Sequence, residues 1–116
     1  MKGKALLAEF IGTFALTFVG IGAIASNYIL NGGPGLVSIA LAHGLTLAVM
    51  VSATAAISGG HINPAVTLGA LLGGKIDVPN AIGYIVAQCL GGIVAAVLIK
   101  LAMPAAALAA GELGDT

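Results

Sequence analysis

The chain of 116 residues is 59% apolar and only 7% charged, and its four basic and four acidic residues give a formal net charge of zero. This composition excludes an ordinary soluble domain, and the lack of a basic excess argues against nucleic acid as a partner. One cysteine, Cys89, leaves no disulfide within the chain and no cysteine-rich metal site. We therefore expect an all-α membrane protein without cofactor or metal.

Three apolar stretches are long enough to cross a membrane as helices. A hydrocarbon core of about 30 Å requires roughly 20 helical residues at a rise of about 1.5 Å each. The transmembrane helices are therefore predicted at residues 5–30, 36–57 and 81–103. The run Asn-Gly-Gly-Pro-Gly at 31–35 is typical of a turn, so the first two helices should be antiparallel.

The segment 58–73 contains a further apolar patch at 64–72 that is too short to cross the membrane. A nine-residue helix measures only about 13 Å, which predicts a re-entrant half-helix. Backbone of this kind must be covered by protein or line a water-filled cavity, because lipid cannot satisfy its polar groups. Residues 104–116 lose the apolar pattern and are expected to be a polar loop or tail after a structural repeat at 1–103.

The lysines predict the orientation of these helices. Three crossings place Lys2, Lys4 and Lys75 on one side of the membrane and Lys100 on the other. Because cytoplasmic loops carry an excess of lysine and arginine, the amino terminus is expected in the cytoplasm. We expect an integral protein of the plasma membrane, or of the inner membrane of a bacterial cell.

The re-entrant segment opens with the run Ser-Gly-Gly-His-Ile-Asn-Pro-Ala-Val-Thr at 58–67. Asn63 is a preferred N-cap, and Pro64 is a preferred first helical residue. A cap inside the membrane would point free N–H groups and the positive end of the half-helix into a pore, which opposes cations. The Asn63 amide would supply donors, and the acceptors would be the backbone carbonyl groups of Gly60, His61 and Ile62.

This run, together with Ala-Glu-Phe-Ile-Gly-Thr-Phe at 8–14, resembles the first repeat of the major intrinsic proteins, or aquaporins. The resemblance covers nearly the whole chain. It implies a passive channel for water and other small neutral solutes, in which Asn63, Pro64 and Ala65 form the first of two signatures that meet tip to tip. The positive ends of half-helices are already known to exclude protons and cations in aquaporin-type pores.

The resemblance also implies roles for residues around the re-entrant loop. Glu9 would be costly in lipid and is expected to brace the loop, with Thr13 one turn further along the helix. A carboxylate facing solvent near the membrane surface is the alternative for Glu9. His61 is expected to anchor the loop through its ring nitrogens, although direct contact with the solute is also open.

His43 matches one position of the family's aromatic/arginine constriction, which acts as the selectivity filter. A histidine there is similar to vacuolar plant aquaporins and to relatives that pass ammonia or peroxide. The alternative is a histidine that is satisfied by helix packing. Leu47, one turn along from His43, and Val66 could form the apolar wall of the pore, and ordinary core packing is an equal alternative.

The second repeat that the resemblance requires is missing from this sequence, which has one Asn-Pro-Ala and no arginine. Either further sequence supplies it, or the chain pairs with an inverted copy of itself. The resemblance implies a homotetramer in which each protomer has its own pore.

Other functions also stay open at this point. A glycerol- or ammonia-type channel of the same family is one alternative, and a non-conducting structural or junction protein is another. An enzyme is not expected, because the sequence has no nucleophile with a base, no paired carboxylates and no phosphate-binding loop.

Overall fold

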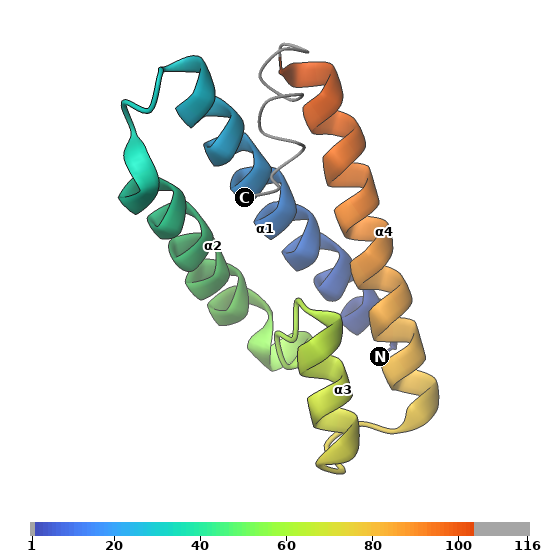
Figure 1. Ribbon diagram of the computed structural model, residues 1–116. Coiled ribbons are helices and arrows are strands. Elements are labelled where there is room, and N and C mark those ends of the chain that lie inside the picture. The colour runs from blue at the N-terminus through green and yellow to red at the C-terminus, as the bar shows by residue number, and fades with distance from the viewer. Residues whose placement is uncertain (1, 104–116) are drawn as a thin grey trace.

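The computed structural model describes residues 2–103, and this part of the chain folds into four helices without any strand (Figure 1). The prediction of an all-α fold is therefore confirmed. In chain order the helices are α1 (Lys2–Ile29), α2 (Gly35–Ser58), α3 (Pro64–Leu72) and α4 (Val78–Ala102).

Three of these helices, α1, α2 and α4, are long and apolar enough to cross a membrane. Their ends lie one to three residues from the predicted ends. The short helix α3 coincides with the patch predicted as a half-helix. The predicted polar tail, 104–116, lies outside the residues that the structure describes.

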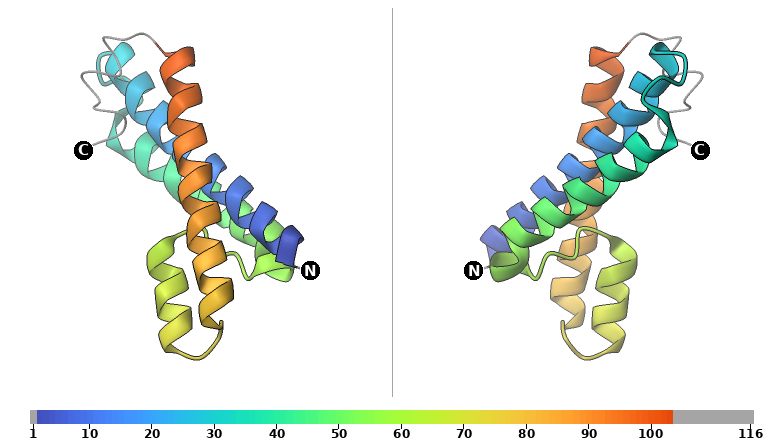
Figure 2. Two further views of the ribbon diagram at one scale, coloured as in Figure 1. Left: turned by 90° about the vertical axis from the view of Figure 1, so that its right-hand side faces the viewer. Right: turned by 90° about the vertical axis from the view of Figure 1, so that its left-hand side faces the viewer.

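The helix α1 occupies the centre of the arrangement, in contact with α2 on one side and α4 on the other. α1 and α2 are antiparallel, and α3 runs beside the first half of α4 in the opposite direction (Figures 1 and 2). Lys75 and the start of α1 line the same cavity, whereas Lys100 lies in the last turn of α4. The lysines are therefore distributed between the two ends as predicted.

Small residues allow α1 and α4 to approach closely. A Cβ atom on Gly91 would overlap the backbone carbonyl oxygen of Phe10. Ala87 and Ala95, one turn away on either side, are buried in the same contact region of α4. Packing within this chain therefore accounts for these small residues, as expected where helices associate through backbone contact in membranes.

The interior is polar where the helices meet the re-entrant segment, and most of the outer surface is apolar. Among the residues whose burial is described, 3–103, the buried polar ones are Glu9, Thr54, Ser58, Thr67 and Gln88. In contrast, α2 buries only two residues and exposes large apolar side chains along its length. Such a surface requires lipid or other protein around it.

The contact at Gly91 predicts a large difference between two neighbouring glycines. Gly91→Ala should destabilise the chain by about 1–3 kcal/mol, because α1 and α4 must separate to admit the methyl group. Gly92→Ala is the matched control, because its Cβ would lie 3.7 Å from Thr17 Oγ1, an ordinary contact. Reversible unfolding in mixed detergent micelles measures both variants, and equal stabilities would contradict the assigned contact.

Candidate functional site

Glu9 lies in the first part of α1, and its side chain is fully buried. Its Oε2 accepts hydrogen bonds from the Ser58 hydroxyl at 2.6 Å and from the His61 backbone N–H at 3.1 Å. Its Oε1 accepts from the Ile62 backbone N–H at 2.8 Å and from Gln88 Nε2 at 2.7 Å. Each carboxylate oxygen thus has two donors, which is what a buried carboxylate requires. Glu9 makes the contacts that the predicted bracing role demands.

The loop that Glu9 holds has an unusual backbone conformation. Three of its residues have positive φ angles: Gly59 at 88°, Gly60 at 64° and Ile62 at 57°. The left-handed region of backbone conformation is rare for a β-branched residue such as Ile62, and adopting it costs of order 1–3 kcal/mol. The hydrogen bond from Ile62 to Glu9 and the burial of the Ile62 side chain offset that cost. Gly12 makes the burial possible, because a Cβ there would lie 2.9 Å from the Ile62 side chain.

The carbonyl groups of Gly60, His61 and Ile62 accept no hydrogen bond from any residue within 2–103. Positive φ angles on either side of His61 turn successive peptide groups differently from a regular helix or strand. While the N–H groups of His61 and Ile62 donate to Glu9, the carbonyl oxygens of the loop stay available as acceptors. They are the groups that the sequence predicted to line a pore.

Asn63 caps the half-helix α3 as predicted. Its backbone is extended, with φ −158° and ψ 127°, and its Oδ1 accepts a hydrogen bond from the Ala65 N–H at 2.8 Å. Pro64 occupies the first turn, where its missing N–H costs nothing. Because the cap uses Oδ1, the Nδ2 amide of this exposed side chain is left to donate to another molecule.

His61 is anchored on the protein side of the loop. Its Nδ1 lies 2.9 Å from the hydroxyl of Thr67, which is fully buried and also accepts from Gln88 Nε2 at 3.0 Å. The centroid of the Tyr84 ring lies 5.0 Å from that of the imidazole. The Tyr84 hydroxyl donates a hydrogen bond to the Ser58 carbonyl at 2.7 Å. These contacts favour the anchoring role of His61 over direct contact with a solute.

Thr13 does not make the contact expected of it. Its hydroxyl oxygen is buried but has no hydrogen-bond partner within residues 2–103. The four donors around Glu9 already hold the loop, so the predicted bracing role of Thr13 is not supported. Gln88 Oε1 is also buried without a partner in the same part of the chain, because the amide turns its Nε2 toward Glu9 and Thr67.

His43 lies where α2 contacts α1, and its side chain is half-buried. Its Nδ1 is 2.8 Å from the Ile39 carbonyl oxygen, and its ring lies over Gly20 of α1. Within residues 2–103 the Nδ1 atom has a partner on α2, which fits the packing alternative that the sequence left open, and part of the ring stays accessible. Leu47 and Val66 are 41% and 50% exposed, so neither belongs to the core of this chain.

Four residues of the site were missed by sequence reasoning: Ser58, Thr67, Tyr84 and Gln88. The first two lie within the signature run, and Gln88 lies in the middle of an otherwise apolar span. A polar side chain at that depth is expensive and normally has a partner, which is the signal that could have identified Gln88.

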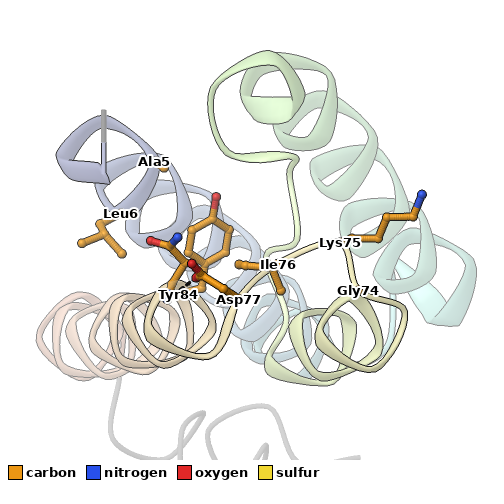
Figure 3. Close-up of a pocket in the computed structure, with 8 residues that line it drawn as sticks. Ala5, Leu6, Gly74, Lys75, Ile76, Asp77 and Tyr84 are labelled. Atoms are coloured by element: carbon orange, nitrogen blue, oxygen red, sulfur yellow. Dashed lines mark hydrogen bonds between the residues drawn. The ribbon is translucent and has the colours of Figure 1, made fainter.

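A cavity of about 390 Å³ lies among the first turns of α1 and α4 and the loop between α3 and α4, and Tyr84, which contacts His61, forms part of its lining (Figure 3). Its lining comprises Ala5, Leu6, Gly74, Lys75, Ile76, Asp77, Asn80 and Tyr84. Figure 3 shows the Lys75 side chain pointing away from Tyr84. None of the predicted site residues lines this cavity. Within residues 2–103 no cluster of His, Cys, Asp and Glu could hold a metal ion.

The family model for the major intrinsic proteins matches residues 2–114. The chain is 53% identical to aquaporin TIP1-2 of Musa acuminata over 85% of this chain and 41% of that protein. It is 49% identical to aquaporin TIP1-2 of Zea mays, over 92% of this chain and 44% of that protein. The chain is also 48% identical to probable aquaporin TIP3-2 of Arabidopsis thaliana, over 85% of this chain and 41% of that protein. The chain spans less than half the length of these curated relatives.

The hydrogen bonds of Glu9 predict the effect of a nearly isosteric change. Glu9→Gln replaces one acceptor oxygen by a donor, so two of the four donors lose their acceptor, at about 1–3 kcal/mol each. Because His61 and Ile62 donate to different oxygens, one of these two amides loses its acceptor and should exchange with solvent faster, which hydrogen exchange mass spectrometry measures. Asp77→Asn is the control, since that exposed carboxylate only caps α4 through Oδ1. Unchanged exchange at both amides would show that Glu9 does not hold the loop.

Proposed function

Because the chain belongs to the major intrinsic protein family, we propose that it supplies the first pore-forming repeat of a passive channel for water and other small neutral solutes. It is an integral membrane protein with three apolar spans. The observation that carries the proposal is the half-helix α3, which presents the capped end at Asn63 next to three free carbonyl groups.

The proposed conduction path uses the acceptors and donors of the loop in sequence. Water would donate to the carbonyl oxygens of Gly60, His61 and Ile62, and would then accept from the Asn63 amide. The positive end of α3 opposes the passage of cations and protons at the same level, as is known for aquaporin-type pores. Leu47 and Val66, both exposed in this chain, would supply the apolar wall.

A complete pore requires a second half-helix that faces α3. Residues 2–103 contain three helices that could cross the membrane, so a tandem second repeat would be inverted relative to the first. We propose that this repeat, with the arginine of the constriction, comes from further sequence or from an inverted copy of the chain. Assembly as a homotetramer is part of the same proposal and rests on family membership alone.

His43 and the TIP-type relatives bear on which solutes pass and on the membrane in which the protein lies. His43 at the constriction favours solutes beyond water, with ammonia-type permeation ahead of glycerol, because a glycerol channel is expected to carry tryptophan there. The TIP-type relatives favour the tonoplast over the plasma membrane that the sequence led us to expect. A histidine at the position of His43 is similar to vacuolar plant aquaporins, which also favours the tonoplast.

The channel function is tested by stopped-flow shrinkage of liposomes that contain the assembled channel, under an impermeant osmolyte. We expect fast shrinkage with a low activation energy, and shrinkage no faster than that of empty liposomes would refute the function. Asn63→Asp keeps the Oδ1 cap but replaces the Nδ2 donors with negative charge, so water flux should fall several-fold and cation leak should rise. Asn80→Asp, the same change outside the loop, should alter neither.

His43→Trp tests the proposed constriction separately. The larger ring should lower water flux or shift solute preference if the side chain lines the narrowest part of the pore. Leu45→Trp is the control on the same helix, because Leu45 is 60% exposed and a larger side chain fits at that position. If the His43 variant passes water, glycerol and ammonia at unchanged rates, His43 does not belong to the filter.

A further inference from the structure

We propose that Gly20 of α1 is a specificity-determining residue, because it sets the position of the His43 imidazole at the constriction. The inference rests on the proposed function, in which His43 borders the pore. It extends that function to a residue on another helix that has no polar group of its own and was not singled out from the sequence.

The first observation is the contact between the ring and Gly20. A Cβ atom built on Gly20 would lie 2.5 Å from His43 Nε2, 3.0 Å from Cδ2 and 3.2 Å from Cε1. Real Cβ atoms do not approach a neighbour closer than about 3.0 Å. The imidazole therefore occupies the volume that any side chain at position 20 would fill, and only glycine permits this position of the ring.

The second observation concerns the other ring nitrogen. Nδ1 lies 2.8 Å from the carbonyl oxygen of Ile39, one turn earlier on α2. A carbonyl only accepts, so Nδ1 must carry the proton and donate it. One nitrogen of the imidazole is thus held by its own helix and the other is directed at Gly20. In this position His43 meets a solute with the bulk of its ring and not with a free nitrogen.

Gly20 therefore determines how far the imidazole projects from the contact between α1 and α2. A methyl group at position 20 would push the ring away from α1 and strain its hydrogen bond to Ile39. The displaced ring would narrow the proposed pore and turn Nε2 toward the solute. A solute larger than water, such as glycerol, should be affected more strongly than water itself.

The test compares Gly20→Ala with Gly22→Ala in the assembled channel reconstituted in liposomes. Gly22 lies on the same helix, but its Cβ would lie 3.5 Å from Ile99 Cδ1 and 4.0 Å from Met103 Cε, both ordinary contacts. Gly20→Ala should lower the ratio of glycerol to water permeability by roughly tenfold, the effect of one carbon atom in a tight pocket. Gly22→Ala should leave the ratio unchanged.

Two further measurements show whether the effect passes through the imidazole. In a His43→Ala background the ring is absent, so Gly20→Ala should no longer change the permeability ratio. Solid-state NMR of the assembled channel should show a through-space contact between Gly20 Cα and the His43 ring in the parent protein. The same contact should be lost in Gly20→Ala and kept in Gly22→Ala.

The outcomes separate this inference from the proposed function. A parent channel that conducts water, combined with an unchanged ratio in Gly20→Ala, would overturn the inference and leave the channel function standing. Absence of the Gly20–His43 contact in the parent spectrum would also overturn it. A parent protein that conducts nothing would refute the channel function itself, and with it any role of Gly20 in specificity.

Discussion

The buried carboxylate of Glu9 is the interaction on which the rest of the structure depends. It joins α1 to the re-entrant loop and to Gln88 of α4 through four hydrogen bonds. Glu9 is fully buried, so no water can replace a lost partner, and each broken bond leaves a polar group unsatisfied. The loop can therefore move only if several bonds break together. This constraint holds Ile62 in a strained conformation and places Asn63 at the start of α3.

The remaining architecture allows this polar centre to exist within an apolar molecule. α1 and α4 approach closely enough for Glu9 and Gln88 to meet because Gly91 has no side chain to separate them. The large apolar residues lie mainly outside, where a membrane protein gains from contact with lipid. Small residues at helix contacts and polar residues at the centre thus replace the apolar core of a soluble domain.

The sequence predicted the helices well because the thickness of the membrane determines their length, and the Asn-Pro pair marked the start of α3 because capping is a local property. It identified Glu9 because a charge in an apolar span needs a partner. The partners themselves depend on how helices distant in the sequence pack. Gln88 was therefore missed. A role was assigned to Thr13 that its hydroxyl, without a partner within residues 2–103, does not support. The contact between His43 and Gly20 became visible only in three dimensions.

The order of the Glu9 partners along the chain has a consequence for biosynthesis. Ser58, His61 and Ile62 leave the ribosome well before Gln88, which lies in the last of the three spans. Until that span enters the membrane, the carboxylate lacks one donor, and Thr67 lacks the amide that also binds it. The hydrogen-bond network around the re-entrant loop is therefore complete only after α4 has docked. α4 completes a site that earlier segments began, so a truncation before α4 would leave this network incomplete.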